Sequence, residues 1–296
     1  MLEFRDIAIT DKNKICTALK KSDFMGCEYS FANNMAWKRL ADSQICFYKE
    51  FYICGAFSTD DGTPHFILPA GSGDYCDVIN ELKNFSNSLN KPLVLTGVTE
   101  NSLKMLGELF PDAFTAEYDR DSSDYIYDSQ KFITLQGKNN HGKRNHLARF
   151  MELSPVYSPV TDNDIDDCIT FCTKEYNDRS DNADHSFIAE QYAINTYFSY
   201  FHELGLSAGL IRIDGNIAAV SIGEQLNSDT FCVHIEKADT HYNGIYTGIA
   251  NLFAKNNAAG FKYINREEDL GLEGLRKSKL SYHPEFLLNK YIVTFK

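Results

Sequence analysis

The segment Leu206-Ser-Ala-Gly-Leu-Ile-Arg-Ile-Asp-Gly-Asn-Ile-Ala-Ala-Val-Ser-Ile-Gly-Glu-Gln225 joins two apolar runs through Asp214-Gly215. An Asp-Gly pair between apolar runs is a strong signal for a two-residue β-hairpin. The residues that follow predict a third strand, a helix and a fourth strand, and this succession indicates a mixed α/β sheet. The predicted strands are 206–213, 217–225, 230–236 and 261–264, and the helix is 244–259.

The first half of the chain predicts the same order of elements. Gln44 to Phe57 indicates two strands that turn at Lys49-Glu50, and helices and strands alternate after it. A closing pair of strands is predicted at 113–118 and 123–127. The repeat concerns the order of elements and not the residues themselves. We therefore expect two related α/β units, at residues 1–128 and 161–296, joined by a linking segment and helix at 129–160.

Composition sets the broad class. The chain has 296 residues, 43% of them hydrophobic and 24% charged, which is ordinary for a soluble globular protein. A net charge of −12 argues against broad, non-specific nucleic-acid binding but leaves room for one local basic groove. Because no long apolar run or leader sequence is present and the eight cysteines form no Cys-x-x-Cys pair, we expect a cytoplasmic protein without a transmembrane segment, with free thiols.

A basic stretch runs from Leu135 to Phe150 in this acidic chain. No acid lies between Asp128 and Glu152. A local excess of cations can attract an anionic ligand where the remaining surface repels one. The alternative is a solvated helix face that packs by Leu147, Phe150 and Met151. The cations between Asp128 and Glu152 are Lys131, Lys138, Lys143, Arg144 and Arg149.

A second unusual stretch, Asn265 to Pro284, contains three consecutive acids, Glu267-Glu268-Asp269, and continues into a cationic helix. Acids before a helix commonly complement its dipole, and this is the simpler interpretation for at least two of them. Arg276 and Lys279 are i, i+3 neighbours that could hold a phosphate. The alternative for both cations is a solvated face.

Three motifs carry a family resemblance. They are Gly137-Lys138-x-x-His141-x-Lys143-Arg144-Asn145-His146, Glu236-Lys237-Ala238-Asp239-x-x-Tyr242-x-Gly244-Ile245-Tyr246, and Asn265 to Lys279. They resemble a bacterial family similar to the C-terminal domain of phosphatidylglycerol lysyltransferase and, more distantly, to Fem-type peptidoglycan aminoacyltransferases. The resemblance implies a tandem GNAT fold and transfer of an acyl or aminoacyl group. The implied donor is anionic, the acceptor end of aminoacyl-tRNA or acyl-CoA, and the acceptor is a small molecule, a peptide or a lipid headgroup.

Direct acyl transfer needs a base, donors for the developing oxyanion and cations for an anionic donor. Glu236 ends the third strand of the second unit and is our candidate base, the alternative being a salt bridge to Lys237 or Arg266. Tyr242 is the second catalytic candidate. In acyl-CoA enzymes the turn before the next helix is glycine-rich and binds pyrophosphate, whereas here only Gly244 and Gly248 are present. No covalent nucleophile and no metal-binding spacing is predicted.

The sequence thus predicts an acyl- or aminoacyltransferase that moves its group to an amine or hydroxyl. Two alternatives stay open: a CoA-dependent N-acetyltransferase, and a non-catalytic module that binds an anionic ligand. The residues predicted to bind substrate are Lys138, His141, Lys143, Arg144, Asn145, Asn243, Tyr246, Asn265, Glu268, Arg276 and Lys279.

Overall fold

The computed structural model describes residues 2–177 and 185–296. The described chain divides into two compact units. Each unit contains segments that are distant in sequence, because the chain leaves the first unit and returns to it twice. The first unit comprises Met1–Asp124, Glu268–Gly271 and Leu287–Lys296, and the second comprises Tyr125–Glu267 and Leu272–Phe286.

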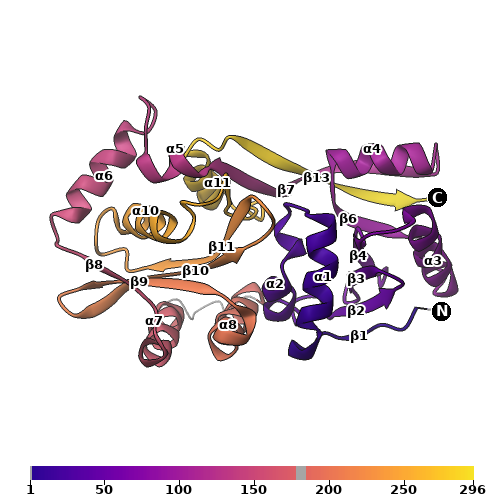
Figure 1. Cartoon of the computed structure of the whole chain (residues 1–296), viewed down its shortest axis with the longest axis horizontal. Coiled ribbons are helices and arrows are strands. Elements are labelled where there is room, and N and C mark those ends of the chain that lie inside the picture. The colour runs from indigo at the N-terminus through magenta and orange to yellow at the C-terminus, as the bar shows by residue number, and fades with distance from the viewer. Residues whose placement is uncertain (1, 178–184) are drawn as a thin grey trace. The chain divides into compact units, whose positions relative to one another are not determined.

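The first unit is a mixed sheet with helices on both faces (Figure 1). Its helices are α1 (Lys12–Ser22), α2 (Phe31–Ala36), α3 (Tyr75–Ser88) and α4 (Glu100–Leu109). Its strands are β1 (Arg5–Asp6), β2 (Ser43–Tyr48), β3 (Phe51–Ala56), β4 (His65–Ile67), β5 (Ala70–Gly71), β6 (Val94–Thr99), most of β7 (Phe114–Asp128) and nearly all of β13 (Phe286–Phe295).

The alternation of side chains along β3 places the helices of the first unit. Phe51 and Ile53 join a buried cluster with Val78 and Leu82 of α3. Tyr52 points to the opposite face, where its hydroxyl accepts a hydrogen bond from Asn34 of α2 at 3.0 Å. The strand order is β1-β2-β3-β4-β6-β13-β7, with β4 and β6 parallel.

The second unit has helices on both faces of its own sheet (Figure 1). Its helices are α5 (Ser129–Thr134), α6 (His141–Met151), α7 (Ile165–Asn177), α8 (His185–Ser199), α9 (Phe201–Leu204), α10 (Ile245–Asn257) and α11 (Glu273–Leu280). Its strands are β8 (Val156–Pro159), β9 (Ser207–Ile213), β10 (Asn216–Gln225), β11 (Thr230–Ala238), β12 (Tyr263–Asn265) and the end of β7.

The two units share a strand order. In the second unit the order is β8-β9-β10-β11-β12, followed by the end of β7, and β11 and β12 are parallel. The first unit has the corresponding series β1-β2-β3-β4-β6, in which the last two strands are also parallel. The predicted hairpin is confirmed, because Asn216 pairs with Ile213 across the Asp214-Gly215 turn. The predicted α/β class is therefore confirmed, although the strands form one continuous sheet and not two.

Helix α6 packs directly on α10. Phe150 of α6 is fully buried and lies in a cluster with Ile245 and Ile249 of α10. Two glycines of the α10 region make this approach possible: a Cβ on Gly244 would lie 2.7 Å from the carbonyl oxygen of His146, and one on Gly248 would lie 2.3 Å from the Phe150 ring. These two glycines leave space for α6, and this role was not predicted from the sequence.

Several boundaries differ from those predicted. The two strands predicted at 113–118 and 123–127 are one strand, β7. Its polar middle is locally bent, because the Asp119 side chain accepts a hydrogen bond from the backbone N–H of Ser122, and Ser123 donates its hydroxyl to the Asp119 carbonyl. The predicted linking segment, 129–160, lies within the second unit, and most of β13 belongs to the first.

Three smaller findings concern the sequence-based expectations. None of the eight cysteines, all of which lie in the described part of the chain, forms a disulfide. Among the described residues, no helix has both the length and the apolar character needed to cross a membrane. The packing face of α6 is narrower than predicted, because Phe150 is buried but Met151 is 45% exposed.

The contact between α6 and α10 yields a stability prediction. Gly248→Ala should lower stability, because the new methyl group would overlap the Phe150 ring. Overpacking of this kind costs about 1–3 kcal/mol and outweighs a gain in helix propensity of about 1 kcal/mol. Thermal unfolding followed by circular dichroism measures the difference.

The matched control for this prediction is Gly142→Ala, which adds the same methyl group to α6 where nothing lies within 4 Å of the new Cβ. It should leave stability unchanged or slightly raised. If both variants unfold at the same temperature, the close approach of the two helices is not a constraint on the fold.

Candidate active site in the second unit

The site begins where the ladder between two parallel strands ends. Strand β11 pairs with β12 only from Thr230 to Cys232, whose last partner is Asn265. Strand β11 then continues to Ala238, whereas the segment that follows β12 turns away from it. The buried Asn265 side chain makes this turn by accepting the N–H of Glu267 at 2.7 Å. The two strands therefore separate, and side chains take the place of the backbone ladder.

Glu236 and Arg266 bridge this separation. Arg266 donates from Nη2 to Oε2 of Glu236, and their side chains are only 11% and 13% exposed. Burial opposes the charge on Arg266, but the Glu236 carboxylate raises the pKa of the guanidinium above its ordinary value. This ion pair is the predicted alternative to a catalytic Glu236.

Arg266 also lies among aromatic rings. Its guanidinium carbon is 5.0 Å from the ring centre of Tyr282, and two further rings, Tyr127 and Phe132, lie at 6.0 and 5.5 Å. A guanidinium is well suited to such stacking. The Nη1 atom of Arg266 is buried and has no hydrogen-bond partner among the described residues. That nitrogen is a buried donor that a substrate oxygen could satisfy.

Lys143 reaches the same aromatic group from α6. Its Nζ lies 3.7 Å from the ring centre of Tyr282. Burial lowers the pKa of Lys143 to about 8, and the positive charge of Arg266 contributes to the shift. The local set thus contains two cations, Lys143 and Arg266, and one acid, Glu236. This excess positive charge favours an anion at the site.

A cavity of about 270 Å³ opens beside Lys143 at the N-terminal end of α10. Tyr242, Asn243 and Tyr246 line it, so that three residues predicted from the sequence share one cavity with a fourth, Lys143. The backbone N–H groups at a helix N-terminus favour negative charge. Here that end of the helix is combined with a half-buried ammonium group.

A second cavity, of about 300 Å³, adjoins the other part of the basic stretch. Lys138 and Lys131 line it together with Tyr282 and His283. Lys131 forms an exposed ion pair with Glu285 at 2.6 Å. Tyr282 thus borders this cavity while its ring also contacts Lys143.

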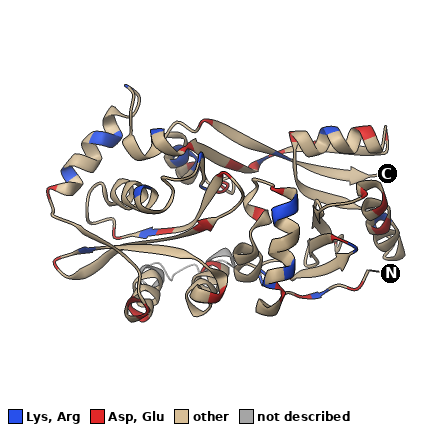
Figure 2. Cartoon of the chain, viewed as in Figure 1, with Lys and Arg blue, Asp and Glu red and all other residues tan. Residues whose placement is uncertain are grey.

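The remaining residues of the basic stretch have other surroundings. Arg144 donates to the carbonyl oxygens of Leu135 and of Gly137, the latter at 2.8 Å, and so holds the loop before α6. His141 and Asn145 are exposed, and their side chains lie 3.4 Å apart. Figure 2 shows lysines and arginines distributed along α6. The basic stretch is therefore partly a ligand-accessible surface and partly a structural support.

The residues predicted near the C-terminus are not brought together as a phosphate clamp. Lys279 is buried, and its Nζ donates to the carbonyl oxygen of Arg266 at 2.6 Å, which holds that segment in place. Arg276 remains half-buried on α11. Glu268 belongs to the first unit, where it contacts the Cys27 thiol at 3.2 Å. Asp269, interpreted as a dipole complement, is fully buried and pairs with Arg120 at 3.2 Å.

Sequence reasoning missed two groups of residues. Tyr127, Phe132 and Tyr282 look like ordinary core aromatics in sequence, and only the fold gathers them around Arg266. Cys232 and His234 carried a usable signal, because Cys-x-His-x-Glu places polar side chains on alternate positions of an otherwise apolar strand. Such a pattern on a buried strand indicates that one face meets polar partners.

A model of the family described as "Phosphatidylglycerol lysyltransferase, C-terminal" matches residues 20–294. A conserved protein of unknown function from Bacteroides thetaiotaomicron is 34% identical, with a TM-score of 0.91 over the whole of both chains. The structure of L-PGS from Bacillus licheniformis is 14% identical, with a TM-score of 0.69 over 97% of this chain and 92% of that one, and shares the fold.

An uncharacterised protein from Mycoplasmoides gallisepticum is 29% identical over 175 residues, which cover 58% of this chain and 56% of that protein. The match thus spans about half the length of that relative. The family match, by contrast, covers nearly all of the sequence, including the three motifs that carried the resemblance. The chain belongs to the phosphatidylglycerol lysyltransferase C-terminal family.

Proposed function

We propose that the second unit transfers an aminoacyl group from aminoacyl-tRNA to an amine or hydroxyl acceptor. The observation that carries this proposal is the half-buried Lys143, which lines the cavity at the N-terminal end of α10 and shares the Tyr282 ring with Arg266. Two cations beside one acid favour an anionic donor. Membership of a lysyltransferase family supports an aminoacyl group as the group transferred.

The packing of α6 supports tRNA over acyl-CoA as the donor. In an acyl-CoA enzyme, glycines before the helix let pyrophosphate approach the backbone. Here Gly244 and Gly248 accommodate His146 and Phe150, and the cavity beside them is lined by Tyr242 and Tyr246. The cations of α6 continue beyond this cavity, as an extended polyanion would require.

The residues of the site have distinct roles in the proposed reaction. The acceptor nitrogen or oxygen attacks the ester carbonyl carbon, and the bond from that carbon to the ribose oxygen breaks. Arg266 Nη1 donates to the developing oxyanion. Glu236, held by Arg266 through Oε2, accepts the proton of the nucleophile at Oε1 and returns that proton to the departing ribose oxygen. Tyr242 is the alternative proton acceptor at the cavity.

The test offers the purified full chain two labelled donors, bacterial tRNA charged with radioactive amino acids and a mixture of acyl-CoA thioesters. Acceptors are supplied as peptides, as a small-molecule extract and as vesicles that contain phosphatidylglycerol. Transfer from charged tRNA supports the proposal, and transfer from acyl-CoA alone replaces it with the N-acetyltransferase alternative. Binding of tRNA without turnover of either donor would identify a non-catalytic module.

Lys143 should make donor binding dependent on pH. Below a pH of about 8 its side chain carries a positive charge, and above that pH the charge is lost. Affinity for tRNA should therefore fall as the pH rises through this range, and a bound anion shifts the fall to higher pH because it raises the Lys143 pKa. Filter binding of tRNA across the range measures the effect, which Lys143→Arg should abolish.

Removing the Lys143 charge should weaken donor binding outright. Lys143→Met should lower the affinity at neutral pH about 10-fold to 100-fold, the worth of a charge-assisted contact. The matched control is Lys255→Met, which removes the same charge from the exposed, far end of α10. Equal losses in the two variants would mean that tRNA responds only to net charge.

Glu236 should affect turnover more than affinity. Glu236→Gln should lower the turnover of charged tRNA about 100-fold or more with little change in donor affinity, because proton transfer is a transition-state task. The amide keeps the size of the side chain and can still accept a hydrogen bond from Arg266, but it removes the counter-charge of a buried guanidinium, so thermal unfolding is measured first to establish that the variant is folded. Single-turnover kinetics separates the two quantities, and unchanged turnover would transfer the role of base to Tyr242.

A further inference from the structure

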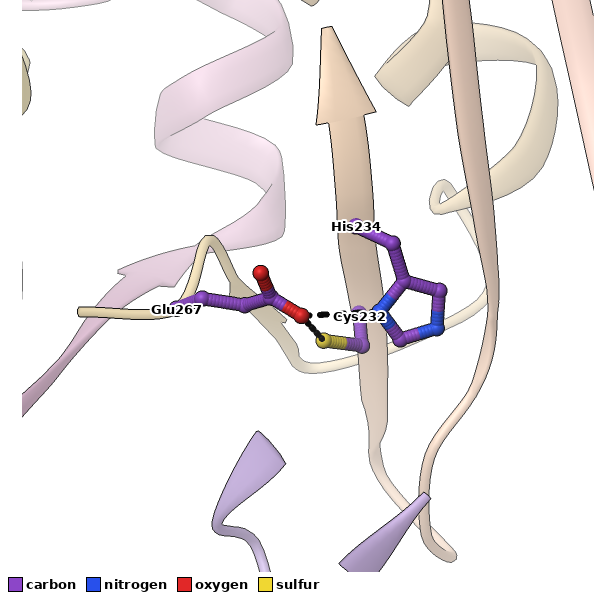
Figure 3. Close-up of side chains that lie close together, drawn as sticks. All are labelled: Cys232, His234 and Glu267. Atoms are coloured by element: carbon purple, nitrogen blue, oxygen red, sulfur yellow. Dashed lines mark hydrogen bonds and ion pairs between the residues drawn. The ribbon is translucent and has the colours of Figure 1, made fainter. Parts of the chain in front are cut away.

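A second polar cluster lies on the same strand, β11, and has no part in the proposed transfer. Cys232 and His234 point to one face of the strand, and Glu267 approaches them from the segment after β12 (Figure 3). Nδ1 of His234 lies 2.9 Å from Oε1 of Glu267, and the Cys232 sulfur lies 3.9 Å from the same oxygen. One donor atom from each residue lies within 4.8 Å of the other two.

The surroundings fix the imidazole of this cluster. The His234 side chain is fully buried, and the Tyr197 ring of α8 stacks on it with an interplanar angle of 9°. Its second nitrogen, Nε2, lies 3.2 Å from Oε1 of Glu224 on the neighbouring strand β10. The imidazole is thus held between two carboxylates, each less than a fifth exposed.

The charges of this cluster suit a divalent cation. Two carboxylates and a thiol surround a single imidazole, so these four side chains together carry a negative charge even when the imidazole is protonated. Burial of excess charge is costly unless a counter-ion is present. A divalent cation between the sulfur, Nδ1 and Oε1 would compensate it.

The donor set indicates which cation fits. Thiolate, imidazole and carboxylate ligands together suit zinc, and tetrahedral bonds of about 2.0–2.3 Å place such donors about 3.3–3.6 Å apart. The observed separations of 2.9 and 3.9 Å lie around these values. A ligating imidazole normally donates its other N–H to a carboxylate. Oε1 of Glu224, 3.2 Å from Nε2 of His234, is in position to accept it.

We propose that Cys232, His234 and Glu267 bind one Zn²⁺ ion, with Glu224 orienting the imidazole. The ion would join β11 to the chain just beyond the last backbone pair, Cys232 with Asn265. It would therefore close the separation of the strands by coordination, next to the place where Glu236 and Arg266 close it by an ion pair. The proposal is independent of the donor and acceptor of the transfer reaction.

A second cysteine-containing cluster found among the described residues, in the first unit, supplies the control. Cys27, Asp124 and Glu268 also place their donor atoms within 4.8 Å of one another. There the Lys290 ammonium group already lies 2.7 Å from Asp124 and 3.6 Å from the Cys27 sulfur. A side-chain cation thus occupies the position that a metal would need, and we expect no zinc there.

The experiment measures zinc in the full-length protein. After treatment with a chelator and dialysis against a zinc buffer, the wild-type protein should hold one ion per chain by mass spectrometry of the metal, and so should Cys27→Ser. Cys232→Ser should lose the ion. Glu224→Gln keeps all three ligands and should weaken zinc binding about 10-fold to 100-fold.

A spectroscopic measurement covers the case in which Cys232→Ser does not fold. Cobalt added to the chelated wild-type protein should give thiolate-to-cobalt charge-transfer absorption, which zinc displaces and which Cys27→Ser retains. The proposal is overturned if the wild-type protein binds no stoichiometric zinc, or if the cobalt spectrum shows no thiolate ligand. It is equally overturned if Cys27→Ser, and not Cys232→Ser, removes the ion.

Discussion

The candidate site depends on one backbone event, the end of the parallel ladder between β11 and β12 at Cys232 and Asn265. Beyond it, the two segments of the chain separate, and polar side chains occupy the space between them. Buried charges are tolerated only when they are paired, and Arg266 and Glu236 meet that condition for each other. The same geometry leaves the second guanidinium nitrogen of Arg266 as a buried donor in the part of the chain that the structure describes.

A second constraint places the basic helix. Because Gly244 and Gly248 lack side chains, α6 comes close enough to α10 for Phe150 to be buried between them. That contact carries Lys143 to the Tyr282 ring and to the cavity at the start of α10. Packing and electrostatics are therefore coupled here: a change that moved α6 away from α10 would also remove the half-buried cation from the cavity.

The run of acids after β12 shows how far local sequence can mislead. Glu267, Glu268 and Asp269 look like complements to the dipole of the next helix, yet their side chains have separate partners. Glu267 contacts His234, whereas Asp269 is fully buried against Arg120. Both partners are distant in sequence, so no local pattern could assign them.

The sequence by itself determined the α/β class, the hairpin at Asp214-Gly215 and the repeated order of strands, because turn chemistry and hydrophobic periodicity are local properties. It also identified Lys143, Tyr242 and Tyr246, which line one cavity. Only the tertiary structure decided that Lys279 is buried, and that Arg266 lies between a carboxylate and aromatic rings. Those outcomes depend on which distant segments meet, and the pattern of a single segment carries no information about its partners.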